Sequence, residues 1–192
     1  MSYFFGDWLL LYACDIAYLM KSILFILGTS REGRKSEVVA HYVVSVAKRR
    51  GDIKPIFVDV RDYPQTSTGG LDPEQAKSLD ALIRSVKGMV IISPEYNHGY
   101  PGELKLFLDN AYQAYEGKPV SICAVSDGPI GGARMTEQLK LVLSAFQMMI
   151  INAAVYFANV DQVFDKKGKI QQAAFWNKRI NGMLDQVLKY SK

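Results

Sequence analysis

Five apolar runs, each followed by a segment with helical spacing, constrain the fold of this chain more than any other feature. The first run, residues 23–27, is continuously apolar, which is typical of a central parallel strand covered on both faces. In the next segment Val39, Val43, Val46 and Ala47 recur at the spacing of one helix face. A chain that alternates in this way is expected to form a parallel sheet with right-handed crossovers and helices on both faces. Five strands fit the sheet order 2-1-3-4-5, so we predict a three-layer α/β sandwich.

The remaining elements follow from the same patterns. We expect the other strands at residues 54–60, 88–93, 120–126 and 150–157. We expect four further helices. The first begins at Asp72-Pro73, the second covers about residues 102–115, the third follows the glycine-rich residues 127–132, and the last spans residues 173–190. The helix near 102–115 carries aromatic residues that indicate either a subunit interface or a buried core face, namely Phe107, Tyr112 and Tyr115.

Composition bounds the class of protein. The 192 residues are 49% apolar and 22% charged, as in a globular chain with one domain and a substantial core. The net charge of +4 is mild and no clustered basic stripe or zinc-finger spacing is present, which argues against nucleic-acid binding. Two cysteines and two histidines without metal-ligand spacing predict no metal site, and the low cysteine content fits a reducing cytoplasm.

The start of the chain does not follow the repeating pattern, so we place the domain at residues 20–192 and an N-terminal extension at residues 1–19. Residues 8–20 are strongly apolar, but they are too few to span a bilayer and include Asp15. They also lack the charged start and the small-residue cleavage site of a signal peptide. Three interpretations remain: an upstream start or cloning-derived segment before a natural beginning at Met20, a short helix that packs on a partner subunit, or a membrane-surface segment. We favour the first, and we expect no membrane partner.

The loop after the third expected strand has an unusual composition. Residues 93–102 are dense in Pro, Gly, Tyr, Asn and His, and they stand where a strand ends and a helix begins. In an open α/β sheet this is where ligands bind. The backbone N–H groups of Asn97, His98 and Gly99 can face a planar heteroaromatic ligand. The rings of Tyr96 and Tyr100 can cover it. The alternative is an ordinary turn that places Pro101 in the first turn of the next helix.

The loop after the first strand is predicted to bind a phosphate group. Hydroxyl groups there come from Thr29, Ser30 and Ser36, and positive charge comes from Arg31 and Arg34. The helix that follows directs its free N–H groups and the positive end of its dipole at the same place. The alternative is that Ser30 or Ser36 caps the helix and that the arginines are solvated. The loop lacks the Gly-Lys-Ser/Thr and Gly-x-Gly-x-x-Gly signatures, which disfavours nucleoside triphosphates.

The loop after the fourth strand, residues 126–134, contains three glycines before its arginine. These glycines let the backbone lie against a flat ligand, and Arg134 can contact a neighbouring loop. Strands 1, 3 and 4 are neighbours in the expected order, so the three loops meet at one edge of the sheet. We therefore predict that they share one ligand.

Three motifs, in this order and spacing, resemble those of the NADPH-dependent FMN reductase family of flavodoxin-like proteins, which includes quinone, azo-compound and chromate reductases. Residues 28–34, Gly-Thr-Ser-Arg-Glu-Gly-Arg, match the family's phosphate loop, with Thr29 in place of its first serine. Residues 94–105 match its Pro-Glu-Tyr-Asn-x-Gly/Ser-x-Pro-Gly-x-Leu-Lys stretch almost letter for letter, and residues 126–134 match its Ser-x-Gly-x-x-Gly-Gly-x-Arg loop. The resemblance covers nearly all of the chain from Met20 onward and leaves out residues 1–19.

The resemblance implies a flavodoxin-like fold and FMN as a non-covalently bound cofactor. The residues that it implies in FMN binding are Thr29, Ser30, Arg31, Arg34 and Ser36 around the phosphate, Pro94, Glu95, Tyr96, Asn97, His98 and Gly99 along the isoalloxazine, and Ser126 and Gly128 at its other edge.

The resemblance further implies an oxidoreductase that passes a hydride from NADPH or NADH through FMN to a quinone, flavin, azo compound or similar small acceptor by a ping-pong mechanism. No side chain is expected to be catalytic, because the flavin carries the chemistry; His98 as a proton donor to a quinone is an alternative that we do not favour. A homodimer or homotetramer is implied as well. Two other classes stay open, a flavodoxin-like electron carrier without enzymatic activity and a flavin-binding redox sensor.

Overall fold

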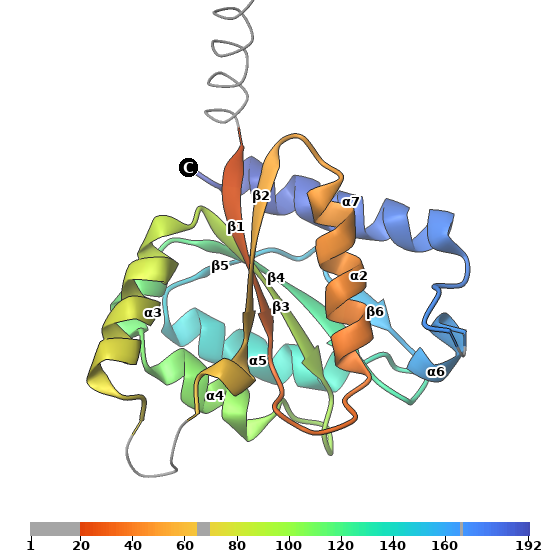
Figure 1. Cartoon of the computed structure of the whole chain (residues 1–192), viewed down its shortest axis with the longest axis horizontal. Coiled ribbons are helices and arrows are strands. Elements are labelled where there is room, and N and C mark those ends of the chain that lie inside the picture. Colours follow the sequence, from red (N-terminus) through yellow and green to blue (C-terminus); the bar gives the residue numbers. More distant parts are fainter. Residues whose placement is uncertain (1–19, 65–69, 166) are drawn as a thin grey trace, which may run out of the picture.

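A parallel sheet lies at the centre of the protein (Figure 1). The structure is a computed structural model that describes residues 20–64, 70–165 and 167–192. The strands are β1 (Lys21–Leu27), β2 (Ile53–Asp59), β3 (Gly88–Pro94), β4 (Pro119–Val125), β5 (Met149–Ile150) and β6 (Val155–Phe157). They run parallel in the order β2-β1-β3-β4-β5, and β6 also pairs with β4. The predicted sheet order is therefore confirmed, with one additional strand.

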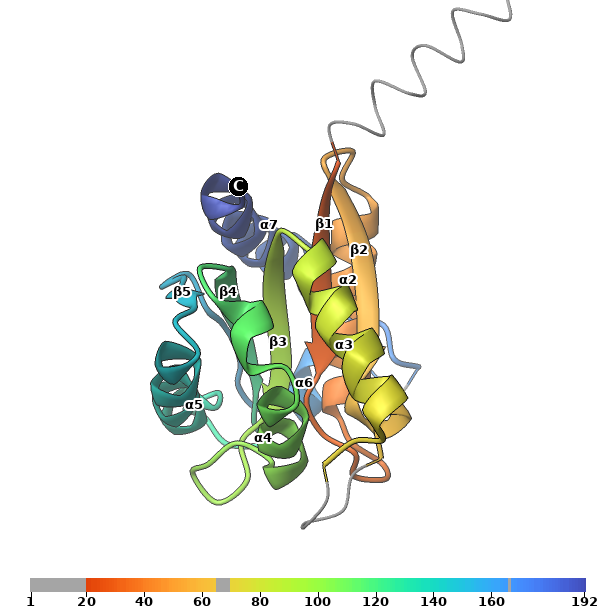
Figure 2. The same ribbon diagram turned by 90° about the vertical axis from the view of Figure 1, so that its left-hand side faces the viewer.

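Helices cover both faces of the sheet, as the alternating pattern predicted. They are α2 (Ser36–Lys48), α3 (Pro73–Ser85), α4 (Gly102–Asp109), α5 (Ala133–Ala145), α6 (Val160–Val163) and α7 (Ala173–Tyr190), with the 3₁₀ helices η1 (Val60–Asp62) and η2 (Tyr112–Tyr115). One core cluster packs α2 and α7 against the sheet, and a second packs α3, α4 and α5 against its other face. In Figure 2, α3 and α4 lie in front of the sheet and α2 lies behind it.

The continuous apolar run of β1 is explained by this double cover. Ile23, Phe25 and Leu27 belong to the core cluster with α2 and α7, whereas Leu24 and Ile26 belong to the opposite cluster. All five side chains are fully buried. Since burial of such a side chain stabilises a fold by about 1.5–3 kcal/mol, this strand anchors both cores and fixes where its following loop begins.

The predicted fifth strand, residues 150–157, is wrong as a single element. The chain instead forms β5 beside the start of β4 and β6 beside its end. Between them the Ala154 N–H donates to the Asn152 carbonyl at 3.0 Å, and the Ser121 hydroxyl on β4 binds the Ala153 carbonyl at 2.8 Å. Asn and Ala are poor strand formers, so the break falls at the residues where side-chain packing supports a strand least.

The helix expected over residues 102–115 is also interrupted, because α4 ends at Asp109 and η2 follows. Asn110 caps α4, and its side chain donates to the Leu106 carbonyl at 2.6 Å and accepts from the Leu71 N–H at 3.0 Å. Of the aromatic residues in question, Phe107 and Tyr115 are fully buried whereas Tyr112 is 56% exposed. The core interpretation therefore holds for Phe107 and Tyr115.

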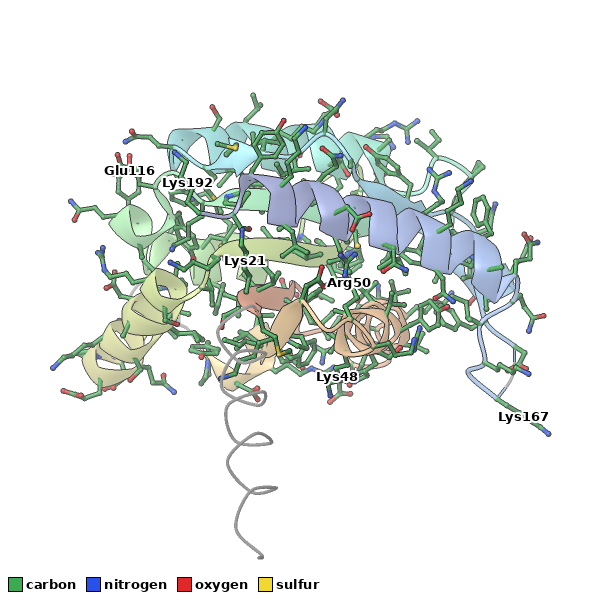
Figure 3. The ribbon with its side chains drawn as sticks, turned by 90° about the horizontal axis from the view of Figure 1, so that it is seen from above. Lys21, Lys48, Arg50, Glu116, Lys167 and Lys192 are labelled. Carbon is green, nitrogen blue, oxygen red and sulfur yellow. The ribbon has the colours of Figure 1, made fainter. Side chains whose placement is uncertain are left out.

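The two ends of the sheet differ in what surrounds them. Figure 1 shows the loops after β1 and β3 side by side at the end where the strand arrows point. Figure 3 looks at the opposite end, where Lys21 begins β1 and Lys48 and Arg50 mark the end of α2.

Within the described ranges, no helix is long and apolar enough to cross a membrane. The N-terminal extension predicted at residues 1–19 lies outside those ranges.

Candidate functional site

The loops that follow β1, β3 and β4 border one cleft of about 730 Å³. This volume is within the range of about 300–1,000 Å³ that small-molecule sites occupy. The residues that line the cleft are Arg31, Glu32, Gly33, Arg34, Lys35, Ser36, Pro94, Glu95, Tyr96, Asn97, Val125, Ser126, Asp127, Gly128 and Val160. The structure thus brings the three unusual loops to a single place, as expected from the sheet order.

Ser36, the first residue of α2, presents a polar group that lacks a partner. Its side chain is 1% exposed, and its hydroxyl makes no hydrogen bond with the described residues. An unsatisfied buried hydroxyl costs about 1–3 kcal/mol, so a ligand atom that binds it removes this cost. The N-terminus of α2 has no side-chain cap, so the alternative in which Ser30 or Ser36 caps this helix is wrong. Lys35 and Ser36, at the start of α2, both line the cleft, and the N-terminal end of a helix favours an anion.

The two arginines of the first loop have different environments. The Arg34 side chain is 1% exposed, and its guanidinium binds both carboxylate oxygens of Asp59 and the Thr29 carbonyl. Burial alone would raise the pKa of Asp59, but hydrogen bonds, first of all from Arg34, hold it below its usual value. Arg31 is exposed, and its guanidinium carbon lies 5.6 Å from the centre of the Tyr96 ring. Arg31 is therefore free to bind an anionic group, whereas Arg34 is committed to the loop itself.

Glu103 on α4 ties the first loop to the second, and sequence reasoning did not identify it. Its Oε1 accepts from the Thr29 hydroxyl at 2.8 Å and from the Ser30 N–H at 2.9 Å. The Thr29 Oγ1 also lies 3.1 Å from the Tyr96 hydroxyl. Burial raises the pKa of Glu103, but backbone and hydroxyl hydrogen bonds outweigh it and the net shift is downward. Thr29 and Ser30 do not line the cleft, so they are placed to shape the loop.

The second loop contains a tight hairpin. Tyr96 and Gly99 exchange two backbone hydrogen bonds of 2.9 Å, and the residues between them, Asn97 and His98, have φ values of 48° and 71°. Positive φ at both central positions is the geometry of a type I′ turn. The Gly99 N–H is used within the hairpin, whereas those of Asn97 and His98 have no acceptor among the described residues. Asn97 lines the cleft, but His98 and Gly99 do not.

Glu95 joins the second loop to the third. Its side chain is 9% exposed, its Oε2 accepts from the Met135 N–H at 3.2 Å, and its Oε1 lies 3.8 Å from Arg134 Nη1. Met135 is in the first turn of α5, where a carboxylate satisfies free N–H groups. The expectation that Arg134 contacts a neighbouring loop is confirmed.

The glycines of the third loop serve two purposes. Gly128 lines the cleft, and its N–H donates to the Ser126 hydroxyl at 3.0 Å. Gly131 and Gly132 have φ values of 68° and 85°. A Cβ atom at Gly132 would lie only 2.9 Å from that of Ala124 on β4. The glycine pair therefore allows close packing of the loop on the sheet, and Gly128 is the glycine placed for ligand contact.

Lys35 borders the cleft on the side of α2 and pairs with two carboxylates. Lys35 Nζ lies 3.0 Å from Asp127 in the third loop and 2.6 Å from Asp161 on α6. These carboxylates raise the pKa of Lys35. Across the described parts of the chain, no cluster of three or more His, Cys, Asp or Glu residues is placed to hold a metal ion. The lining carries three cationic side chains, Arg31, Arg34 and Lys35, and three carboxylates, Glu32, Glu95 and Asp127. The features that favour an anion are therefore local to the start of α2, where the Ser36 hydroxyl and the Arg31 side chain lie.

A second, larger hollow of about 1030 Å³ lies between β5 and α7. Its walls are residues 149–154 and one side of α7, with Phe175, Lys178 and Arg179 among them. None of the three loops contributes to it. Ligand sites in open α/β sheets are built at the carboxyl ends of strands, so the smaller cleft is the candidate functional site.

The sheet order and the position of the cleft define a flavodoxin-like α/β protein with a candidate ligand site at the carboxyl ends of its strands. A sequence model of NADPH-dependent FMN reductases matches residues 21–162, and the chain belongs to this family. It is accordingly an oxidoreductase with FMN as cofactor and NAD(P)H as reductant.

Known proteins that resemble the chain agree with this family. An NAD(P)H-dependent FMN reductase of Schizosaccharomyces pombe is 33% identical over 138 residues, which are 67% of this chain and 68% of that protein. A quinone reductase of Escherichia coli K12 is 32% identical over 149 residues, 73% of this chain and 78% of that protein. In fold, the flavoenzyme FerB of Paracoccus denitrificans superposes with a TM-score of 0.76 at 20% identity, over 90% of this chain and all of that one.

Proposed function

We propose that this protein is an FMN-dependent NAD(P)H oxidoreductase whose second substrate is a quinone or a similar small oxidant. The observation that carries the proposal is the cleft where an unpartnered Ser36 hydroxyl, the N-terminus of α2 and three loops converge. The choice of a quinone is supported by relatives named quinone reductase and, in a Burkholderia species at 30% identity, 2-hydroxy-1,4-benzoquinone reductase.

The chemistry of the cleft fits FMN. The phosphate would be held by Arg31, the Ser36 hydroxyl and the N–H groups at the start of α2, all of which line the cleft. Thr29, Ser30 and Arg34 would act on the shape of the loop, since their polar groups are bound to protein atoms.

The flat ring of FMN would lie against the second and third loops. Pro94, Glu95, Tyr96 and Asn97 line the cleft on one side, and Ser126 and Gly128 line it on another. Asn97 lines the cleft and its N–H has no acceptor in the described parts of the chain, so it would donate to the polar edge of the ring. His98 would contribute by forming the hairpin turn together with Asn97. Gly99 would contribute by closing the hairpin.

When bound, FMN supplies the redox chemistry, as the acceptor of a hydride from NAD(P)H and the donor of electrons to the second substrate. We propose that NAD(P)H and the oxidant occupy the open side of the cleft in turn, which is a ping-pong order. The residues of the cleft bind and orient the reactants, and none has the geometry of a general base. His98 lies outside the cleft lining, so we assign no proton transfer to it.

We also propose a homodimer or homotetramer in a reducing cytoplasm. Exposed apolar side chains, Leu141 at 75% and Tyr112 at 56%, support a contact between subunits. The buried free thiol of Cys123 agrees with a compartment in which disulfides are not needed. Sedimentation at several protein concentrations would give the number of subunits.

The test is a flavin spectrum followed by a reductive titration. The purified protein is mixed with FMN, desalted, and titrated with NADPH and with NADH in the absence of oxygen. We expect a retained flavin spectrum that bleaches with about one NAD(P)H per flavin, as a two-electron hydride transfer requires. A benzoquinone added afterwards should restore the oxidised spectrum.

Three results would contradict the proposal in different ways. Loss of the flavin on desalting would reject the cofactor site. A retained flavin that NAD(P)H does not bleach would leave a carrier or a sensor. Double-reciprocal plots that intersect, where parallel lines are expected, would reject the ping-pong order.

A further inference from the structure

Guanidinium groups bind the carbonyls of three successive residues in the phosphate loop. Arg34 donates to the Thr29 carbonyl. Arg61 donates from Nε to the Ser30 carbonyl at 2.9 Å and from Nη2 to the Arg31 carbonyl at 2.5 Å. Arg61 belongs to η1, directly after β2, and does not line the cleft. It lines a separate small hollow with Ser30, so it approaches the loop from outside the cleft.

This contact fixes the direction of the loop's peptide groups. In a trans peptide unit, the carbonyl of one residue and the N–H of the next point in opposite directions. The described chain contains no cis peptide bond. Because Arg61 holds the Arg31 carbonyl on the outer side, the Glu32 N–H points to the other side, and Glu32 lines the cleft. That N–H has no acceptor among the described residues.

The direction of the loop carbonyls also determines the partial charges that face the cleft. A carbonyl oxygen carries partial negative charge, so a carbonyl turned into the cleft would repel a phosphate. Arg61 holds two such oxygens, those of Ser30 and Arg31, away from the cleft with one rigid fork of donors. An anion in the cleft would then meet the Glu32 N–H and the exposed guanidinium of Arg31.

Arg61 is itself held in place by the end of β2. Asp59 accepts from the Arg61 N–H at 3.0 Å and thereby caps η1, while its carboxylate also binds Arg34. One carboxylate therefore contacts both arginines that bind the loop carbonyls, Arg34 through its guanidinium and Arg61 through its backbone N–H. The loop is fixed before any ligand arrives, which lowers the entropy cost of binding.

We propose that Arg61 is a positioning residue for the FMN phosphate and acts through the loop backbone without touching the cofactor. The inference rests on the phosphate site proposed above. Arg61 lies outside the three cleft loops, and its role would depend on the phosphate alone.

FMN and riboflavin differ in the phosphate, so their affinities separate this role from a general loss of structure. The full-length protein, freed of flavin, would be titrated with each ligand by flavin fluorescence, as wild type, Arg61→Ala and Arg61→Lys. For Arg61→Ala we expect the Kd for FMN to rise about tenfold, which corresponds to 1.4 kcal/mol, and the Kd for riboflavin to change less than about twofold. Arg61→Lys keeps the charge but not the fork, so we expect it to recover only part of the loss.

The matched control is Arg84→Ala on α3, which removes an exposed arginine whose partner is Asp80. It lowers the net charge by the same amount, and we expect both affinities to stay at the wild-type values. If Arg61→Ala does not fold, as judged by circular dichroism, Arg61→Gln takes its place.

The outcomes separate failure of this inference from failure of the site. Equal losses for FMN and riboflavin, no loss for either, or full recovery by Arg61→Lys would overturn the positioning role of Arg61. A wild-type protein that binds neither ligand would instead reject the FMN site, and one that binds both equally well would reject the phosphate loop.

Discussion

The phosphate loop and the hairpin at Tyr96 border the same cleft but are held in different ways. The phosphate loop, residues 28–36, is fixed by side chains from η1, α4 and the end of β2. The hairpin, Tyr96 to Gly99, is fixed by two hydrogen bonds of its own backbone. The first arrangement depends on charges that must stay paired, whereas the second depends on two residues that tolerate positive φ. The two loops should therefore respond to different substitutions.

Removal of Arg34 should be the most damaging change in the phosphate loop. Arg34→Ala leaves the Asp59 carboxylate and the Thr29 carbonyl without their buried partner, and we expect a loss of about 2–4 kcal/mol in the free energy of unfolding. Urea denaturation measures it. Arg84→Ala, which removes an exposed ion pair on α3, should leave the midpoint almost unchanged. A loss no larger than that of Arg84→Ala would show that the loop does not depend on this pair.

Removal of Arg31 should affect the ligand and spare the fold. Arg31 is exposed, and its side chain is free to meet a phosphate. We expect Arg31→Ala to weaken FMN binding by about 1–3 kcal/mol, the size of a lost charge-assisted hydrogen bond. Equilibrium titration with FMN and riboflavin measures the effect, and Arg49→Ala at the far end of α2 is the control. An unchanged FMN affinity would remove Arg31 from the phosphate site.

The hairpin should become more stable when His98 is replaced by glycine. His98 has a φ of 71°, which is strained for a residue with a side chain, and glycine relieves that strain at some cost in unfolded-state entropy. We expect a net gain of about 0.5–1 kcal/mol. The matched control is His41→Gly on the exposed face of α2, which should lose about 1 kcal/mol because glycine weakens helices. Opposite signs for the two histidines, measured by urea denaturation, would support the hairpin geometry; equal losses would contradict it.

Acid should weaken the phosphate loop before the hairpin. The pKa values of Asp59 and Glu103 are lowered in the folded protein, since hydrogen bonds outweigh burial. Both groups stabilise the fold fully above their unfolded pKa values of about 4, and this contribution is lost as pH falls through the folded values. Unfolding measured between about pH 7 and pH 3 should show a smaller acid loss in Asp59→Asn and Glu103→Gln than in wild type. Identical pH profiles would show that neither carboxylate is coupled to the loop.

The sequence was informative where local patterns decide the structure. Continuous apolar runs and helical spacing predicted the sheet order, because the burial of apolar side chains outweighs the secondary-structure propensities of individual residues. The largely apolar residues 150–157 led to the wrong prediction of a single strand. The weak strand formers Asn152, Ala153 and Ala154 lie in the middle of this segment, and the strand is interrupted there. The gathering of the three loops followed from the sheet order alone.

Sequence reasoning missed the contacts that hold the loops, for a physical reason. Glu103 is 74 residues from Thr29 along the chain, and Arg61 is 31 residues from Ser30. Their meeting depends on how strands and helices pack, which no local pattern encodes. The hairpin gave a partial signal, since asparagine and histidine are both enriched at positive φ, but neither residue requires that conformation. Arg61 stands two residues after Asp59, the last residue of β2, and nothing in that local pattern indicates a contact with another loop.

The division of the last sheet element into β5 and β6 has a consequence for how copies of this protein meet. An exposed strand edge is a template on which another chain can add a strand. At this border of the sheet, the edge consists of a two-residue strand and a three-residue strand separated by a bend. At the opposite border, β2 carries Lys54 and Pro55, a charge and a residue without an N–H. Both borders are therefore protected against strand addition, so the homodimer or homotetramer proposed above would form through helix surfaces instead of a sheet that continues from one copy to the next.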